Sequence, residues 1–236
     1  MDTPLVSKII TVSSELFPPG LPGLPALPAF LVLALAGAGC SNKPPENPRD
    51  YVSTIRIERA EKDDEFKNGS KSPVPENRRA ELLPLGYFPI DPDYKTGATL
   101  TPTDDTAILQ VTTSTGTIRK MRRVGWLEFV LKGQPLKLTA FVEVGAPNND
   151  RLFVPFNDLT SGTETYPGGR YLDLYRNATG IYEIDFNRAY FPYCYYSPTW
   201  ECPIPPAENR LKVPVRAGER FKVQSSKVKV QSEVQS

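Results

Sequence analysis

The sequence predicts a mainly β protein, an antiparallel sandwich or small barrel in a single domain with one N-terminal helix. The chain of 236 residues contains 25 prolines, and proline disrupts the interior of long helices. From Leu82 onward, apolar residues recur with a period of two in short segments that are separated by turn residues, which is the pattern of half-buried strands. Seven such segments without helices between them favour a sandwich or a small barrel.

The first 39 residues predict a signal peptide. Ala29 to Gly39 is an unbroken apolar run, too short to cross a bilayer, which takes about 20 residues. It ends in Gly37-Ala38-Gly39-Cys40, which resembles a bacterial lipobox, in which the cysteine thiol carries diacylglycerol. A short buried helix is the alternative, but the prolines from position 18 to position 28 oppose it. We therefore expect lipidation at Cys40 and a location in the cell envelope, lipid-anchored to the outer membrane or to the periplasmic face of a membrane.

The remaining chain divides into a tether over residues 40–47, a β-rich domain over residues 48–221 and a tail over residues 222–236. The tether is polar and rich in proline, as is usual between an anchor and its domain. The tail repeats Val-Gln-Ser and is expected to be disordered, although its alternating valines leave an extra edge strand open.

A helix is predicted from Pro48 to about Lys67. Asn47 is a favourable N-cap, Pro48 suits the first helical position, and Asp50 places an acid in the first turn. The sequence Asn68-Gly69-Ser70 then ends the helix. Because its apolar residues are sparse, we expect this helix to lie across the domain and not inside it.

The seven strand segments span residues 106–112, 119–131, 136–144, 152–156, 169–174, 181–186 and 211–215. The connections at 114–117 and 132–135 are short enough to require antiparallel hairpins. In the third segment one face carries Leu138, Ala140, Val142 and Val144, and the other carries Lys137, Thr139 and Glu143. This alternation predicts a sheet with one dry and one wet face.

The composition excludes several classes of site. The chain has no histidine, so a Ser-His-Asp triad, a Cys-His dyad and histidine-ligated metal sites are excluded. The net charge of +1 gives the protein no overall positive electrostatic potential that would attract nucleic acid. We therefore expect no nucleic-acid partner, no cofactor and no metal, and we expect a monomer.

Lipidation of Cys40 would leave Cys194 and Cys202 as a pair. In an oxidising periplasm they are expected to form a disulfide worth about 2.6 kcal/mol by the chain-entropy model. Two buried free thiols are the alternative. A zinc site is the less favoured reading, because two thiolates without further ligands make half of such a site.

Three segments resemble a known family: residues 85–92 (LGYFPIDP), residues 152–174 (LFVPFNDLTSGTETYPGGRYLDL) and residues 184–211 (IDFNRAYFPYCYYSPTWECPIPPAENRL). Together they are similar to the uncharacterised prokaryotic family known as domain of unknown function (DUF) 1684, over about residues 50–220. Phe191 departs from the family, which commonly shows asparagine there. The resemblance implies a domain and, for some members, an envelope location; it implies no established activity.

The polar and aromatic residues of these segments supply the candidate binding or catalytic residues. They are Asp158, Thr160, Ser161, Tyr166, Arg170, Tyr171, Asp185, Asn187, Tyr190, Glu208 and Asn209. Strand alternation places Arg170 on the same face as Leu172, so this cation needs a carboxylate partner, for which Asp158, Asp185 and Glu208 are available. The alternative to a functional site is a purely structural role, in which a buried ion pair ties loops to the sheet.

Three functions remain open from these residues. The favoured one is a binding module for a small molecule, glycan or peptide. Its site would be a concave, aromatic end of the barrel, where Arg170 and Asn187 would orient the ligand through polar contacts. Its rings would be Tyr166, Tyr171, Tyr190, Tyr193, Tyr195, Tyr196 and Trp200. The alternatives are a histidine-independent hydrolase that uses Asp158, Asp185 and Glu208, and a structural accessory lipoprotein. The same three carboxylates lack the spacing of a calcium loop.

Overall fold

The computed structural model describes residues 47–145, 150–176 and 178–222. Cys40, the residues expected to form the signal peptide, nearly all of the expected tether and most of the expected tail lie outside these residues. Within the described ranges, no helix combines the length and the apolar character needed to cross a membrane.

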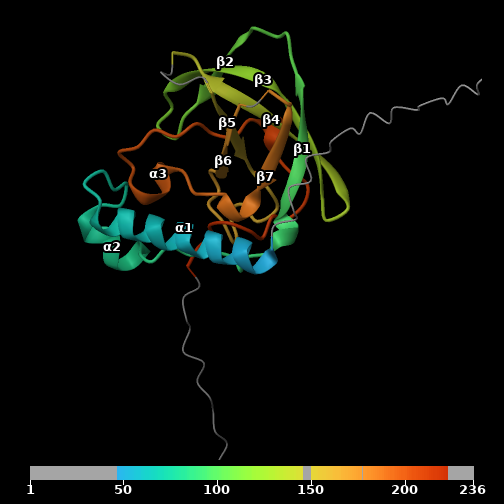
Figure 1. The fold of residues 1–236 in the computed structure, drawn as a ribbon. Helices are drawn as coiled ribbons and strands as arrows, with labels where there is room; N and C mark the ends of the chain where they lie inside the picture. Colours follow the sequence, from blue (N-terminus) through green and yellow to red (C-terminus); the bar gives the residue numbers. More distant parts are fainter. Residues whose placement is uncertain (1–46, 146–149, 177, 223–236) are drawn as a thin grey trace, which may run out of the picture. The chain divides into compact units, whose positions relative to one another are not determined.

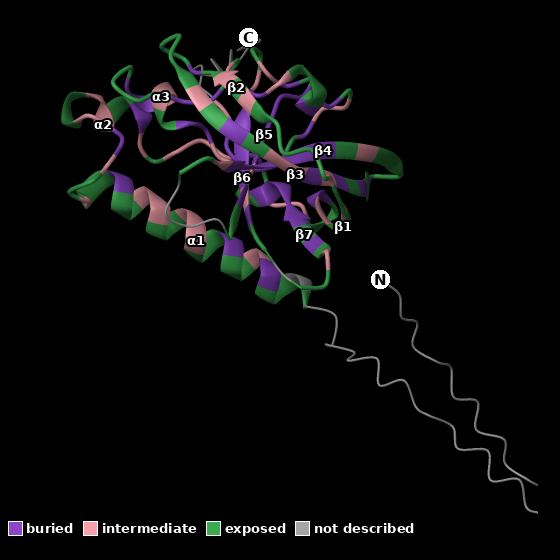
Figure 2. Cartoon of the chain, turned by 90° about the horizontal axis from the view of Figure 1, so that it is seen from above, coloured by how far each residue is buried: buried purple, intermediate pink, exposed green. Residues whose placement is uncertain are grey.

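The first helix, α1, spans Pro48–Asn68 and agrees with the sequence prediction. The Asn47 side chain accepts a hydrogen bond from the backbone N–H of Arg49, as an N-cap does, and Gly69 caps the other end. Figures 1 and 2 show α1 running across one end of the sheet with buried bands along its length. Tyr51 and Ile55 form the buried face of its first turns, so α1 is amphipathic and lies across the domain.

One antiparallel sheet of seven strands makes up most of the fold (Figure 1). The strands are β1 (Lys95–Pro102), β2 (Ile108–Thr112), β3 (Ile118–Leu131), β4 (Gln134–Glu143), β5 (Arg151–Phe156), β6 (Arg170–Tyr175) and β7 (Ile181–Asp185). Their order is β6-β5-β4-β3-β1-β7, with β2 paired to β3. The edge strands β6 and β7 also contact each other, so the sheet nearly closes into a barrel. The prediction of a mainly β fold is confirmed.

Both predicted hairpins are present. The antiparallel pairs β2–β3 and β3–β4 are joined by the turns that the sequence indicated. At the second turn Lys132 has φ +48° and Gly133 has φ +80°. Two consecutive positive φ values are the requirement of a tight type I′ hairpin turn, and glycine adopts such a value without steric cost.

Two strand assignments were wrong. Strand β1 was missed because its sequence, KTGATLTP, contains glycine and proline and little apolar alternation; it is defined by pairing with β3 and β7. Residues 211–215 were expected to be a strand but are irregular. Pro214 has no N–H for a ladder, and the segment bonds instead to the backbone around Asn157 and Leu159.

Short helices also interrupt the predicted loops. They are α2 (Glu76–Leu82), α3 (Tyr193–Tyr196) and three turns of 3₁₀ helix at Pro92–Tyr94, Phe186–Arg188 and Ala207–Asn209. The single N-terminal helix of the prediction is therefore accompanied by smaller ones. Of these, α3 matters most for the site, because it carries the pocket-lining residue Tyr193.

The predicted wet face of β4 needs correction. Leu138, Ala140 and Val142 are buried in the main core, as expected. However, Thr139 and Phe141 on the opposite face are only 1% exposed. The chain after β7 covers this face, and the Asn209 side chain bonds to the backbone of Thr139. The middle of β4 is thus buried on both sides.

Candidate functional site

A pocket of about 750 Å³ lies on the face of the sheet opposite the main core. Leu152, Leu172 and Leu174 point into the core, whereas their neighbours in the same strands line the pocket, as strand alternation requires. The lining residues are Lys62, Arg119, Met121, Glu143, Arg151, Phe153, Tyr171, Asp173, Tyr175, Tyr190, Pro192, Tyr193, Trp200, Glu201, Cys202 and Pro203. They come from α1, from β3 to β6 and from the segment that follows β7.

Aromatic rings form two groups in this pocket. On the sheet, the rings of Phe153 and Tyr171 meet edge to face at 4.7 Å, and Tyr190 meets Tyr171 at 5.8 Å. In the segment after β7, the rings of Tyr193 and Trp200 form a second group and lie 5.2 Å apart. Backbone hydrogen bonds between Tyr171 and Tyr190 fix the first group. Trp200 is 41% exposed, so its ring is accessible to a ligand.

The charged groups of the pocket are largely paired with one another. Arg151 donates to Asp173 at 2.7 Å, and the Tyr190 hydroxyl donates to the same carboxylate oxygen at 2.8 Å. Arg119 pairs with Glu143 at 3.1 Å. The other oxygen of Asp173, Oδ1, is buried and has no hydrogen-bond partner among the described residues. Asp173 therefore serves the pocket through its other oxygen, which holds Arg151 and Tyr190 in place.

Burial and pairing shift the titration of these groups. Burial opposes the charge of Arg151, but the hydrogen bond and charge of Asp173 outweigh it and raise the pKa of Arg151. Burial also raises the pKa of Tyr190 well above its usual value, and the neighbouring Asp173 carboxylate adds to the effect. Tyr190 thus remains a neutral hydrogen-bond donor, and Arg151 remains charged.

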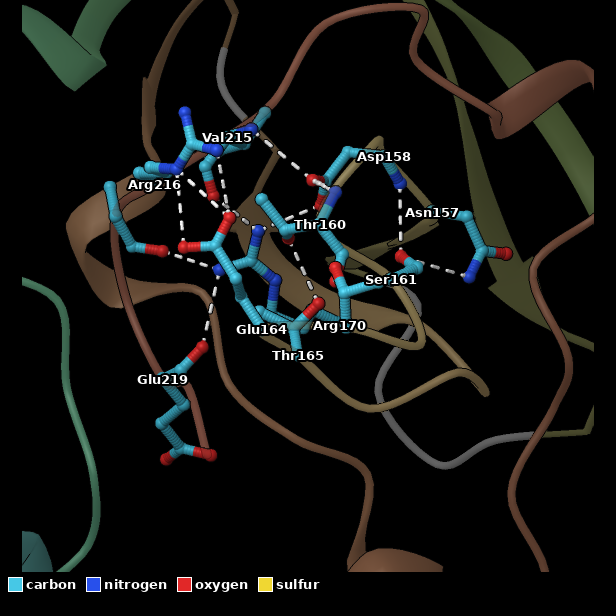
Figure 3. Close-up of polar contacts among 12 residues, drawn as sticks. Asn157, Asp158, Thr160, Ser161, Glu164, Thr165, Arg170, Val215, Arg216 and Glu219 are labelled. Carbon is cyan, nitrogen blue, oxygen red and sulfur yellow. Dashed lines mark hydrogen bonds and ion pairs between the residues drawn. The ribbon is translucent and has the colours of Figure 1, made fainter. Parts of the chain in front are cut away.

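The predicted site around Arg170 is a closed structural network (Figure 3). Arg170 donates to Asp158 at 2.8 Å and to the carbonyls of Val215, Ala217 and Glu219. Both side chains of the ion pair are 1% exposed. Burial lowers the pKa of Arg170, with the Asp158 charge acting in the opposite direction. The network ties the C-terminal segment to β6, and it leaves no opening for a ligand.

The hydroxyls predicted beside Asp158 belong to the same network (Figure 3). The backbone N–H of Thr160 donates to Asp158 at 2.7 Å, and the hydroxyls of Thr160 and Thr165 lie 2.9 Å apart. The Ser161 hydroxyl accepts from the backbone N–H of Asp158. These groups hold the loop between β5 and β6 in place, and none of them is a candidate nucleophile.

The predicted residues Asp185 and Asn187 form a second structural cluster under α1. The Tyr51 hydroxyl donates to Asp185 at 2.9 Å, and the Asn187 amide donates to the Tyr51 oxygen at 2.9 Å. Arg188 completes the cluster with an ion pair to Asp185. Burial first, and the Asp185 charge second, raise the pKa of Tyr51. The cluster fastens α1 to the end of β7.

The remaining predicted residues are dispersed. Glu208 pairs with Arg123 on the exposed surface, and Asn209 is completely buried between strands. Tyr166 lies in a smaller apolar cluster with Phe191 and Tyr195. Of the eleven candidates, only Tyr171 and Tyr190 line the pocket. Arg170 therefore forms the buried ion pair that the structural interpretation described, and the three carboxylates proposed for hydrolysis do not meet.

The expected aromatic concave end is present in part. Tyr171, Tyr190, Tyr193 and Trp200 line the pocket as proposed, whereas Tyr195 and Tyr196 pack in the smaller apolar cluster. Phe191, at the position where asparagine is common, is 2% exposed in that cluster.

Sequence reasoning missed most of the charged lining. Arg151, Phe153, Asp173 and Tyr175 alternate with core residues along β5 and β6, so the faces of these two strands were available as a signal. Lys62 of α1 and Arg119 of β3 line the pocket only because the tertiary fold brings these two elements beside it.

The expected disulfide is not present. Cys194 and Cys202 are free thiols, and the backbone N–H of Cys194 donates to the sulfur of Cys202 at 3.0 Å. The structure thus shows the alternative of two free thiols. The described residues contain no group of three or more cysteine and carboxylate side chains that could hold a metal ion.

Comparison with known proteins places this fold in a family. No curated protein matches the chain. The solution NMR structure of an uncharacterized protein from Haloarcula marismortui is 37% identical, with a TM-score of 0.59, and the match covers 75% of this chain and 97% of that one. The model of the family described as "Protein of unknown function (DUF1684)" matches residues 81–220, which include every strand. The chain therefore belongs to the DUF1684 family.

Proposed function

We propose that this protein is a binding module whose pocket takes a small neutral ligand with a flat apolar face and several hydroxyl groups, as a saccharide has. The observation that carries this proposal is the presence in one pocket of two groups of aromatic rings and of two arginine–carboxylate pairs. Aromatic rings give contact area to an apolar ligand face, and a few polar groups fix its orientation.

The charge balance favours a neutral ligand over an anion. Three cations line the pocket, Lys62, Arg119 and Arg151, and three carboxylates accompany them, Glu143, Asp173 and Glu201. Arg119 and Arg151 already have carboxylate partners. An anion would have to compete with these partners, whereas a hydroxyl group can both donate to a carboxylate and accept from a guanidinium without breaking either pair.

Glu201 is the acceptor best placed for a ligand hydroxyl group, and Asp173 positions two donors that line the pocket. Glu201 accepts from the hydroxyls of Thr115 and Thr117 at 3.2 and 3.1 Å, which hold its carboxylate at the rim. Asp173 Oδ1 lacks a partner among the described residues, and a buried unpaired acceptor costs about 1–3 kcal/mol. Because this oxygen is buried, the contribution of Asp173 to binding is to hold the Arg151 and Tyr190 donors in place.

The lipid anchor is a second part of the proposal. The apolar run and the lipobox at Cys40 support a lipid-anchored domain in the cell envelope, acting as a monomer. Mass spectrometry of the mature N-terminus with and without globomycin tests the anchor. A diacylglyceryl mass on Cys40 that globomycin traps in the unprocessed chain supports it, and an unmodified full-length chain refutes it.

The ligand is tested with the two tryptophans of the chain. Trp200 lies in the pocket and Trp126 lies outside it, on β3. In the full-length protein, Trp126→Phe leaves Trp200 as the fluorophore, and Trp200→Phe leaves Trp126. Titration with a panel of neutral oligosaccharides is expected to change the fluorescence of the Trp126→Phe variant and to leave the Trp200→Phe variant unchanged.

Affinity measurements on pocket variants complete the test. Trp200→Ala and Asp173→Asn are each expected to weaken binding at least about tenfold, since pocket anchors contribute more than ~1.4 kcal/mol. Glu208→Gln, a carboxylate outside the pocket, is the matched control for Asp173→Asn and should bind normally. The proposal fails if no oligosaccharide binds, or if binding survives both pocket substitutions.

A further inference from the structure

We propose that Cys194 and Cys202 form a redox-active dithiol beside the pocket, in which Cys194 is the attacking thiolate and Cys202 is the resolving thiol. This inference concerns thiol chemistry and does not depend on the proposed ligand.

The two thiols are held together by noncovalent contacts. The backbone N–H of Cys194 donates to the Cys202 sulfur at 3.0 Å, and the two thiol groups hydrogen bond to each other. The backbone of Cys202 is fastened to the β2–β3 hairpin, since Ser114 N–H donates to its carbonyl at 2.9 Å. The next residues continue this attachment, with Ile204 N–H donating to Thr112 at 2.9 Å. These contacts hold the two thiols next to each other in the folded protein.

The surroundings of the two sulfurs differ. The Cys194 sulfur has hydrogen bonds to the Cys202 thiol and to the hydroxyls of Ser114 and Tyr166; against opposing burial, these contacts lower the pKa of Cys194 to about 6. The hydrogen bond to Cys194, followed by burial, raises the pKa of Cys202. A shared proton therefore resides on Cys202, and the thiolate is on Cys194.

The other titratable groups near the pair preserve this asymmetry. Arg119 acts on Cys202 and Tyr171 interacts with both sulfurs. The pKa of Tyr171 is raised by burial, and that of Tyr166 is raised to about 12 by burial and by Cys194. Both tyrosines are thus neutral at pH 7, and no carboxylate is prominent among the groups that act on Cys194.

Accessibility also distinguishes the two cysteines. Cys194 is half-buried, whereas Cys202 is 6% exposed. A nucleophile needs both a thiolate and access, and a resolving thiol needs only its partner sulfur. A zinc site is less suitable for the pair, because the described residues bring no third ligand to it.

The reaction is thiol–disulfide exchange with an external low-molecular-weight or protein disulfide. The Cys194 thiolate attacks one sulfur of R–S–S–R, a Cys194–S–S–R bond forms, and R–S⁻ leaves with the bonding electron pair. Cys202 then transfers its proton to a departing thiolate and attacks the Cys194 sulfur, which releases the second R–S⁻. The two protein thiols are oxidised to one disulfide, and the external disulfide is reduced to two thiols.

Oxidation would also restrain the pocket, a consequence that rests on the proposed function. Trp200 lies between the two cysteines in the sequence, and Tyr193 directly precedes the first. A disulfide would close the loop that carries Trp200, so the aromatic group formed by these two rings would lose freedom. Ligand affinity should then differ between the oxidised and the reduced protein.

The test uses the full-length chain with Cys40→Ser, so that only two thiols remain, and oxidised glutathione as the probe. We expect mass spectrometry to find a Cys194–Cys202 disulfide that dithiothreitol reverses without loss of the near-UV circular dichroism. Adding Cys202→Ser should trap glutathione on Cys194. In the protein that keeps both thiols, the rate of Cys194 alkylation by iodoacetamide should level off above about pH 7, because the attacking thiol is then ionised. Adding Cys194→Ser should slow adduct formation on Cys202 at least about tenfold.

A second measurement keeps both Cys194 and Cys202, so its result does not depend on the folding of a variant that lacks one of them. Partial alkylation of the Cys40→Ser protein by iodoacetamide at pH 7, followed by peptide mapping, should label Cys194 before Cys202. Equal rates at the two positions, reaction only in denaturant, or a disulfide that resists reduction until the protein unfolds would each overturn the inference. None of these readouts involves the pocket ligand, so failure here is separate from failure of the proposed function.

Discussion

Asp158→Asn is expected to destabilise the fold strongly although it changes only a few atoms. The substitution keeps an oxygen for the backbone N–H groups of Thr160 and Val215, which donate to Oδ1 at 2.7 and 3.2 Å. What it removes is the negative charge 2.8 Å from the Arg170 guanidinium, where both side chains are 1% exposed. Arg170 would then be a buried cation without its ion-pair partner.

The magnitude follows from this burial. Breaking a buried ion pair by removing one partner costs about 3–5 kcal/mol, against a total stability of roughly 5–15 kcal/mol for a domain. Arg170→Met should cost a similar amount, because it also leaves the carbonyls of Val215 and Ala217 without their donor. The double variant has no unpaired charge, so its cost should fall short of the sum by about 1–3 kcal/mol.

Equilibrium unfolding in urea, followed by circular dichroism, measures these free energies from the midpoint at constant m-value. Arg216→Met is the matched control, since Arg216 pairs with Glu164 on the surface and its loss should leave the midpoint unchanged. A cost below about 0.5 kcal/mol for Asp158→Asn, or strict additivity in the double variant, would refute the structural role assigned to the pair.

Three further perturbations test other parts of the fold. Asn209→Ala should cost at least about 1–3 kcal/mol in urea unfolding, because the buried N–H of Thr139 loses its acceptor at 2.7 Å; a neutral result would contradict the bridging role of Asn209. Glu219→Gln should loosen α1, because Lys62 donates to this buried carboxylate at 2.6 Å, and hydrogen exchange in α1 should accelerate while that of β4 stays unchanged. Burial raises the pKa of Tyr171, so the folded state keeps this proton to higher pH than the unfolded state does. The contribution of Tyr171 to stability should therefore be constant below about pH 10 and should fall above it. Tyr171→Phe should flatten that alkaline decline, and an unchanged slope would contradict the assignment.

Much of the fold was predictable because its signals are local. The α1 helix begins at an N-cap and proline and ends at Asn68, one residue before Gly69. Both hairpins follow from the turn residues between alternating strands. Strand β1 and the irregular segment at 211–215 were missed because their conformations depend on distant partners: β1 lies between β3 and β7, and the segment bonds to the loop around Asn157 and Leu159.

The candidate site was harder to predict for the same reason. Arg170 was correctly identified as a buried cation in need of a carboxylate, because strand alternation places it beside apolar residues. Which of Asp158, Asp185 and Glu208 would pair with it depended on loop paths that local sequence does not encode. The structure chose Asp158, and it placed Asp185 under α1 and Glu208 on the surface.

The sequence by itself determined the mainly β class, the N-terminal helix, the hairpins and the absence of histidine chemistry, since each depends on residue type or on short-range periodicity. Only the tertiary structure decided that the ion pair at Arg170 is closed and that a pocket opens on the other face of the sheet. The physical reason is that a pocket is formed by side chains from separate elements, here Lys62 of α1, Arg119 of β3, Asp173 of β6 and Trp200. Their proximity results from the packing of the whole chain.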